Sequence, residues 1–290
     1  MQAFFHQLLS GLANGAIYAS VALALVMIFK ATHHVNFAQG ELAMFSTYVA
    51  YTLVRSGVPY WVAFVITLTF SFTVGVAIQQ LLLRWLRRAS VLTAVIVFIG
   101  LLVVFNGFAG PIFGFTIKEF PSPFDPHAWY ATTYLSPHEV GTIGVTLLVL
   151  AIVFAFFRFT RLGLAMRASA ESPQSSRLVG IRVGWMLALG WGMAAVLGAI
   201  AGMMAAPTVF LVPNMMGGVL LYGFAAALLG GIDNPWGAPI GGFIVGVLEN
   251  VAGAYVVGSH LKLALALLVI VAVLVFKPGG LFGRTVVVRV

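Results

Sequence analysis

The chain has 290 residues, of which 61% are hydrophobic and only 8% are charged, with a mean hydropathy of +1.07. A soluble domain has about 45–50% apolar and about 25% charged residues, so this composition excludes an ordinary water-soluble protein. It predicts an all-α, polytopic protein embedded in a lipid bilayer. The net charge of +8 lies in short loops between apolar runs. The positive-inside rule explains that distribution without a nucleic-acid partner.

Nine apolar runs approach the ~20 residues that span a bilayer. In chain order they cover 6–29, 37–54, 60–83, 91–113, 139–158, 185–206, 217–231, 238–257 and 261–276. The first run lacks the basic flank and the small-residue cleavage site of a signal peptide, so we expect it to remain as a transmembrane helix. Because the seventh run is short, the sequence predicts a bundle of eight or nine spans in a single domain over residues 1–290.

The basic residues predict the orientation of these spans. If the spans alternate and the C-terminus is cytoplasmic, 12 lysines and arginines fall inside, and 3 fall outside, namely Arg55, Lys118 and Lys262. That asymmetry satisfies the positive-inside rule and places the N-terminus outside. The stretch 118–139, which contains four prolines, is then the main external loop.

Two stretches interrupt the apolar pattern in a related way. They are KATHHVNFAQGELAMF (30–45) and LLGGIDNPWGAPIGGF (228–243), and each separates two apolar runs. A matched pair of interrupted helices, one in each half, is typical of internally duplicated transporters, so an internal repeat is one interpretation. Two ordinary cytoplasmic turns are the other.

Polar residues near these interruptions are candidates for a translocation path. Glu41 and Glu249 are the acids inside the predicted spans, where a charge is costly unless it faces protein or water. Each could line a path or hydrogen-bond an exposed helix end, and Glu41 could instead stabilise a helix start through the macrodipole. The candidates for the path are Asn36, Gln39, Glu41, Glu249 and Asn250.

Signatures of enzymes and metal sites are missing. There is no cysteine, no phosphate-binding P-loop and no GxSxG nucleophile elbow. His33 and His34 are adjacent, and neighbouring helical positions point about 100° apart, so they make a poor metal pair. We therefore expect no catalytic residue, no metal and no cofactor. Five amide side chains predict interhelical hydrogen bonds, with a path lining as the second interpretation: Asn14, Asn36, Gln39, Asn106 and Asn214. Two Gly-xxx-Gly pairs, Gly198 with Gly202 and Gly242 with Gly246, predict close contacts between helices.

A basic, polar island, RFTRLGLAMRASAESPQSSRLVGIRV, occupies residues 158–183 and contains five arginines. Residues 160–170 predict a first short helix. Ser172 is a good N-cap for a second one, with Pro173 at the first helical position and Gly180 just past its end. The pattern predicts two short helices on the cytoplasmic surface. A basic loop held by anionic lipid is the alternative, and it explains only the arginines.

Four segments of the chain resemble one family, the permease subunits of ABC importers for branched-chain amino acids, and in particular its LivH-like members. They are GLAMRASAE (163–171) with LVGIRV (178–183), NFAQGELAMF (36–45), GGIDNPWGAPIGGFIVGVLEN (230–250) and KPGGLFG (277–283). The resemblance is colinear and covers nearly the whole chain. One departure is the pair Ser175 and Ser176, where relatives often have alanines, which affects the packing of the second short helix.

This resemblance implies a transport subunit rather than an enzyme, in the bacterial cytoplasmic (inner) membrane. The implied partners are a second homologous permease, two ATP-binding cassette subunits, a periplasmic solute-binding protein and a small-molecule substrate. It also implies that the cytoplasmic island docks on an ATPase subunit. The docking residues would be Gly163, Ala165, Arg167, Ala168, Glu171 and Gly180.

Two other functions stay open at this stage. Relatives with the same architecture carry urea or short amides. A self-sufficient secondary carrier or channel, with Glu41 and Glu249 as coupling acids, belongs to a different class. An intramembrane enzyme is disfavoured because the sequence has no nucleophile–base or diacid arrangement.

Overall fold

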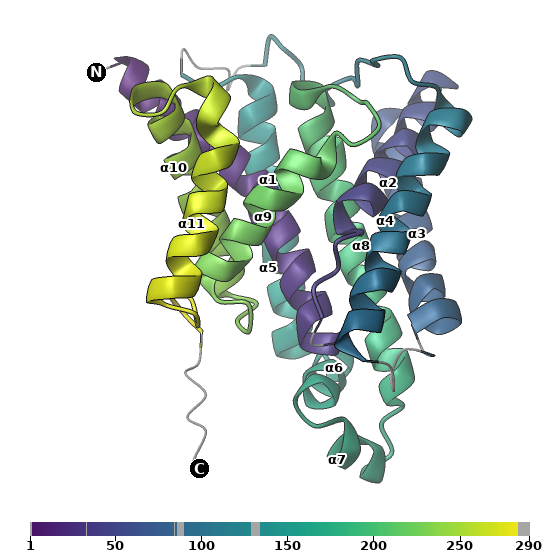
Figure 1. Ribbon diagram of the computed structural model, residues 1–290. Coiled ribbons are helices and arrows are strands. Elements are labelled where there is room, and N and C mark those ends of the chain that lie inside the picture. Colours follow the sequence, from purple (N-terminus) through teal and green to yellow (C-terminus); the bar gives the residue numbers. More distant parts are fainter. Residues whose placement is uncertain (1, 33, 84, 86–89, 129–133, 284–290) are drawn as a thin grey trace. The chain divides into compact units, whose positions relative to one another are not determined.

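The computed structural model describes residues 2–32, 34–83, 85, 90–128 and 134–283 (Figure 1). Over these residues the chain is helical, with turns and one isolated antiparallel bridge between Lys118 and Leu211. His33 and residues 129–133 of the external loop lie outside the described part. So do five of the basic residues counted above on the inside, namely Arg84, Arg87, Arg88, Arg284 and Arg289.

Eleven α-helices make up the described chain, and they confirm the all-α prediction. A π-helical turn, Ile78–Leu82, extends α3, and a 3-10 turn, Ser259–Leu261, precedes α11. The helices are α1 Gln2–Thr32, α2 Gln39–Arg55, α3 Tyr60–Ala77, α4 Val91–Phe113, α5 Pro137–Phe159, α6 Arg161–Glu171, α7 Pro173–Leu178, α8 Val183–Val209, α9 Met216–Gly230, α10 Gly237–Tyr255 and α11 Lys262–Phe276.

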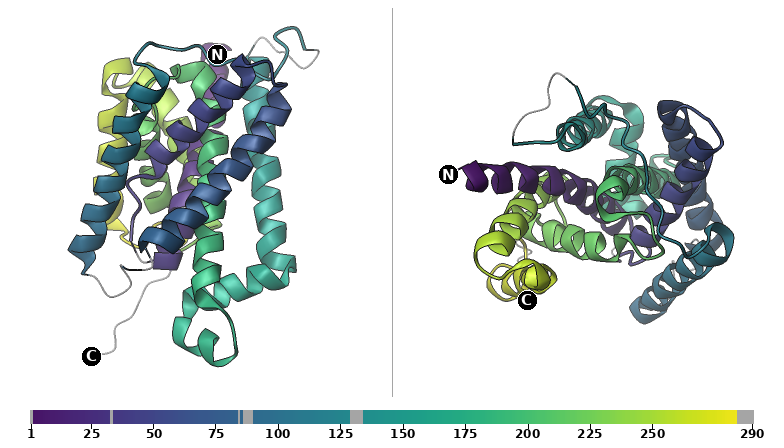
Figure 2. Two further views of the ribbon diagram at one scale, coloured as in Figure 1. Left: turned by 90° about the vertical axis from the view of Figure 1, so that its right-hand side faces the viewer. Right: turned by 90° about the horizontal axis from the view of Figure 1, so that it is seen from above.

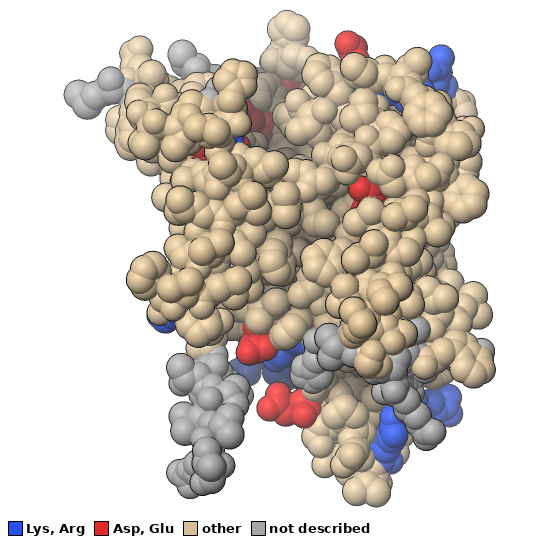
Figure 3. Space-filling model, in the orientation of Figure 1, with Lys and Arg blue, Asp and Glu red and all other residues tan. Residues whose placement is uncertain are grey.

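Six of these helices are long and apolar enough to cross a membrane: α1, α3 with its π-turn, α4, α5, α8 and α10. Two shorter apolar helices, α9 and α11, add to them, whereas α2 is a 17-residue helix of lower hydropathy. Each of the nine predicted runs thus corresponds to one helix, and the number of full crossings stays a prediction. On the face shown in Figure 3, charged side chains are sparse, as expected for a surface that contacts lipid.

The chain forms two compact units, each made of segments distant in sequence. The first unit contains residues 1–26, 124–146 and 218–290, and the second contains residues 27–123 and 147–217. The first therefore holds most of α1 and all of α10 and α11, whereas the second holds α2, α3, α4 and α6 to α8. The single-domain organisation predicted for residues 1–290 stays a prediction.

Small residues bring α1 and α10 into backbone contact in the first unit. A Cβ atom on Gly246 would lie 2.3 Å from the backbone nitrogen of Gly15, and one on Gly242 would lie 2.4 Å from the Cα of Ala19. Only glycine leaves room for such an approach. The predicted packing role of the Gly242–Gly246 pair is confirmed.

A similar contact joins α2 and α8 in the second unit. A Cβ on Gly198 would lie 2.5 Å from the side-chain nitrogen of Gln39, and one on Gly202 would lie 2.4 Å from the hydroxyl of Thr47. Trp191 of α8 is only 1% exposed, and Phe98 of α4 stacks against it. The Gly198–Gly202 pair therefore also packs helices, as its spacing predicted.

The two predicted interruptions lie between separate helices. After α1, the chain turns back along α8, and α2 starts beside the middle of α8 rather than at its end (Figures 1 and 2). Between α9 and α10, Gly231 adopts a φ of +104°, which favours glycine. Whether the two interruptions reflect an internal repeat stays open.

Candidate functional site

The start of α2 carries three of the predicted path residues, all in the second unit. Asn36 accepts the Ala38 backbone N–H through its side-chain oxygen at 3.1 Å, and it accepts the Gln39 N–H through its carbonyl at 3.3 Å. The side chain of Gln39 donates to the backbone oxygen of Ala194 in α8 at 2.8 Å. Asn36 and Gln39 are each 1% exposed. Their hydrogen bonds hold the beginning of α2 against the middle of α8.

Glu41 lies in the first turn of α2, where the helix dipole favours a negative charge. Asn106 of α4 donates its side-chain N–H to the Glu41 carboxylate at 3.1 Å, so Asn106 joins two helices as its residue type predicted. Glu41 is buried, with 3% of its surface exposed. This geometry fits the structural interpretation of Glu41, and its role in a path stays a prediction.

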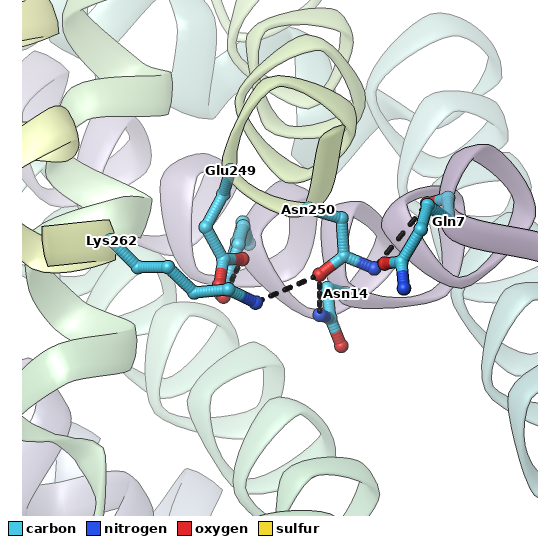
Figure 4. Close-up of polar contacts among 6 residues, drawn as sticks. Gln7, Asn14, Glu249, Asn250 and Lys262 are labelled. Carbon is cyan, nitrogen blue, oxygen red and sulfur yellow. Dashed lines mark hydrogen bonds and ion pairs between the residues drawn. The ribbon is translucent and has the colours of Figure 1, made fainter. Parts of the chain in front are cut away.

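The other two predicted path residues, Glu249 and Asn250, belong to a buried polar cluster in the first unit (Figure 4). Tyr18 of α1 donates to the Glu249 carboxylate at 2.7 Å, and Lys262 of α11 forms an ion pair with it at 3.3 Å. The Asn250 side-chain oxygen accepts from Lys262 at 3.2 Å and from Asn14 at 3.3 Å. The cluster therefore joins α1, α10 and α11.

Neighbouring groups fix the geometry of this cluster. The ring of Tyr222 in α9 stacks on Tyr18, with 4.9 Å between ring centroids. The Asn250 side-chain N–H reaches the backbone oxygen of Gln7 at 3.4 Å. A Cβ on Gly253 would lie 2.5 Å from Cε of Lys262, so this glycine makes room for the lysine side chain one turn beyond Glu249. The lysine is therefore positioned by packing as well as by charge.

Lys262 and Tyr18 also belong to this cluster, although the sequence alone did not identify either of them as a site residue. The sequence assigned Lys262 to the external side by charge counting, and Tyr18 lies within an apolar run. One signal was present: Lys262 begins an apolar helix shortly after a helix that contains an acid. Burial of Glu249 in a membrane helix makes a nearby cation the expected partner.

The basic island forms the two short helices that its sequence predicted, α6 and α7. Ser172 caps α7 by accepting the Ser175 N–H at 3.4 Å, and Pro173 is its first residue. Gly180 has a φ of +84°, and Ile181 donates its N–H to the carbonyl of Ser176 at 2.9 Å. That 6→1 bond is the Schellman stop that a glycine at this position favours.

The predicted docking residues differ in exposure. Arg167, Glu171 and Gly180 are exposed, Ala165 and Ala168 are half-buried, and Gly163 is buried. A Cβ on Gly163 would lie 2.4 Å from the carbonyl oxygen of Phe156, so this glycine permits the tight turn from α5 into α6. Ser169 and Ser176 are buried, at 1% and 4% exposure.

The end of α7 carries an exposed apolar pair that sequence reasoning did not single out. Leu178 is 89% exposed and Val179 is 76% exposed. Leu178 ends α7, whose other residues are mostly polar, and Val179 precedes Gly180. Exposed apolar area of this kind is a candidate contact with a protein or a membrane surface.

Metal ligands are not grouped in the part of the chain that the structure describes: no three His, Asp or Glu side chains lie close enough to hold an ion there. His34 instead lies edge-on to Phe98, with 6.5 Å between ring centroids.

Comparison with known proteins gives a consistent set of relatives. Residues 7–276 match the family described as "Branched-chain amino acid transport system / permease component". The chain is 27% identical to the high-affinity branched-chain amino acid transport permease LivH of Escherichia coli K12 and 28% identical to BraD of Pseudomonas aeruginosa, covering 99% of this chain and 98% of each relative. It is 27% identical to a probable LivH of Methanocaldococcus jannaschii, over 91% of this chain and 87% of that protein. No solved structure gives a significant match.

Proposed function

Because this chain belongs to the branched-chain amino acid transport permease family, we propose that it imports branched-chain or similar small aliphatic amino acids as one subunit of an ATP-driven complex. The chain is a multi-pass membrane protein and a transport component rather than an enzyme. The observation that carries the proposal is the family match over residues 7–276 together with the capped α6–α7 pair.

The proposed complex supplies what the chain itself lacks. Two ATP-binding cassette subunits hydrolyse ATP, a second homologous permease completes the path, and a periplasmic solute-binding protein delivers substrate. The complex lies in the bacterial cytoplasmic membrane, with α6 and α7 on the cytoplasmic side. Closure of the ATPase subunits moves these helices, and the path then alternates between its two sides. Asn36, Gln39, Glu41, Glu249 and Asn250 are its proposed polar lining.

The α6–α7 pair is the proposed docking segment for the ATPase. Arg167 and Glu171 are four residues apart, so they lie on one face of α6 and present opposite charges to the partner. Ala168 lies beside this face, Ala165 lies on roughly the opposite side of α6, and Leu178 with Val179 adds apolar area. Gly163 and Gly180 act by shaping the turns at the two ends of the segment.

Replacing Arg167 or Glu171 by alanine should reduce ATP-driven uptake while the protein still inserts into the membrane. Both side chains are exposed, so their loss leaves the fold intact. Charged hydrogen bonds contribute about 1.5–3 kcal/mol, which corresponds to roughly 10- to 100-fold weaker docking. Uptake by vesicles with matched permease levels measures the effect. Arg161→Ala, an exposed arginine in the same helix, is the control, and unchanged uptake in both test variants contradicts the assignment.

Reconstitution tests the proposed function against its alternatives. Proteoliposomes with all subunits and the cognate binding protein should accumulate leucine only with internal ATP, and the chain alone should accumulate none. Uptake by the chain alone on an ion gradient would instead identify a secondary carrier. Accumulation of urea or a short amide without leucine would identify the other substrate class. Binding of these solutes to the cognate binding protein provides an independent measurement.

A further inference from the structure

The Glu249–Lys262 pair is unusual because both charges lie in helices of a membrane protein and satisfy each other. The Glu249 side chain is 7% exposed and the Lys262 side chain is 29% exposed. The ammonium of Lys262 has three N–H donors, and it also donates to Asn250 at 3.2 Å. Because Glu249 is buried, its pairing with the partly exposed Lys262 is weak evidence of a stabilising role.

Two donors converge on one neutral acceptor in this cluster. The ammonium of Lys262 and the side-chain amide of Asn14 both donate to the Asn250 side-chain oxygen, at 3.2 and 3.3 Å. An amide oxygen resembles one oxygen of a carboxylate, and donors bind a carboxylate more strongly. The position of this oxygen therefore marks where two donors can receive a carboxylate.

The other half of the cluster is arranged for a cation. The Glu249 carboxylate accepts from the Tyr18 hydroxyl through one oxygen and from the Lys262 ammonium through the other, at 2.7 and 3.3 Å. An ammonium group of similar size can replace that of Lys262 at this carboxylate. The cluster thus holds one anionic and one cationic group in direct contact at 3.3 Å, and an α-amino acid, which carries both charges, would separate them and pair with each.

We propose that Glu249 and Lys262, with Asn14 and Tyr18, bind the ammonium and carboxylate groups of an α-amino acid zwitterion during transport. The substrate ammonium takes the place of Lys262 at Glu249, and the substrate carboxylate takes the place of the Asn250 oxygen at Lys262 and Asn14. Every charge stays paired before and after the exchange, so no isolated charge is left in the membrane. Before the substrate binds, Glu249 and Lys262 neutralise each other.

This inference rests on the proposed amino-acid transport and makes it more specific. A neutral solute such as urea carries no charge that could separate Glu249 from Lys262. The cluster therefore favours amino acids over urea and short amides. In this proposal the chain binds the ammonium and carboxylate groups that all α-amino acids share. Selection for an aliphatic side chain of the substrate then depends on other parts of the complex.

The decisive variant removes both charges together. Glu249→Gln with Lys262→Met leaves no unpaired charge, and such replacements are often neutral or stabilising. We expect the full complex with this double variant to assemble and to keep ATPase stimulation by loaded binding protein. Leucine uptake should fall by about 10- to 100-fold, because the substrate loses its charged partners. Glu139→Gln, which removes a carboxylate of the same unit that caps α5, should leave uptake unchanged.

A charge-exchanged variant separates recognition from stability. Glu249→Lys with Lys262→Glu restores an ion pair, but it presents the charges in reversed places to the substrate. Zwitterion recognition predicts a thermally stable complex that still fails to transport leucine. Normal uptake by either the neutral or the exchanged double variant overturns the proposal. If the exchanged variant does not fold, the neutral variant decides.

Direct binding gives a readout that a structural pair would not affect. Labelled leucine should bind the wild-type complex in the absence of binding protein, and excess unlabelled leucine should displace it. Neither 4-methylpentanoate, which lacks the ammonium, nor 3-methylbutylamine, which lacks the carboxylate, should compete at the same concentration. Equal competition by either analogue contradicts the proposal. If the wild-type complex transports urea and not leucine, the proposed function itself fails, which is distinct from leucine transport that survives loss of the pair.

Discussion

Replacing Gly246 by alanine is expected to prevent stable folding of the first unit. The added Cβ would lie 2.3 Å from the backbone nitrogen of Gly15, 2.4 Å from its Cα and 2.5 Å from the carbonyl oxygen of Gly11. Every neighbour is main chain of α1, so no side chain can rotate away to make room. Overpacking typically costs about 1–3 kcal/mol even where side chains adjust, and a larger loss is expected here. The midpoint of thermal unfolding of the purified protein measures it.

Gly144 of α5 is the matched control for this prediction. It lies in a helix of the same unit, and nothing lies within 4 Å of a Cβ built there. Alanine favours a helix over glycine by about 1 kcal/mol, so Gly144→Ala should be neutral or slightly stabilising. If both variants unfold at the same temperature, the close approach of α1 and α10 is not a determinant of the fold.

Replacing Leu178 by aspartate is expected to abolish ATP-driven uptake while the permease stays folded. Leu178 is 89% exposed at the end of α7, so a charge there meets only water in the isolated chain. If the ATPase covers this position, the same charge is buried without a partner, at a cost large enough to reduce docking more than about tenfold. Co-purification of the ATPase with the permease and uptake into proteoliposomes measure the two effects.

Leu178→Met provides the control, since it retains apolar area and helix propensity at the same position. The methionine variant should hold the ATPase and transport at nearly the wild-type rate. Equal uptake by the aspartate and methionine variants would show that the apolar end of α7 lies outside the docking surface, and the proposed contact would then be confined to α6.

Local features of the chain were predictable because their causes are local. The run 91–113 coincides with α4, Val91–Phe113, since about 20 apolar residues in lipid must satisfy their backbone bonds within one helix. The α6–α7 pair was equally predictable, because Ser172, Pro173 and Gly180 act on their own backbone. Residue type and spacing are therefore sufficient to predict helices and helix caps of this kind.

Features that depend on contacts between distant segments could not be predicted. Lys262 looked like a residue at the end of a span, and only the packing of α11 beside α10 brings it to Glu249. The start of α2 beside Ala194 depends on the path of the chain after α1, which no periodicity encodes. The π-helical turn at Ile78–Leu82 is likewise absent from the apolar pattern.

The pairing of Glu249 with Lys262 also bears on how the chain enters the membrane during its synthesis. The two charges are 13 residues apart on consecutive helices, and a linker of residues 256–261 joins these helices. A lone charge adds up to about 2.5–3.5 kcal/mol to the transfer of a helix into lipid, with the full value at the helix centre, so α10 alone inserts against part of this penalty. Once α11 has been synthesised, the pair neutralises both charges. The insertion machinery is therefore expected to release α10 and α11 together as a hairpin. A chain that ends before Lys262, and is held to the ribosome by a polar linker long enough to clear the exit tunnel, should leave α10 associated with that machinery.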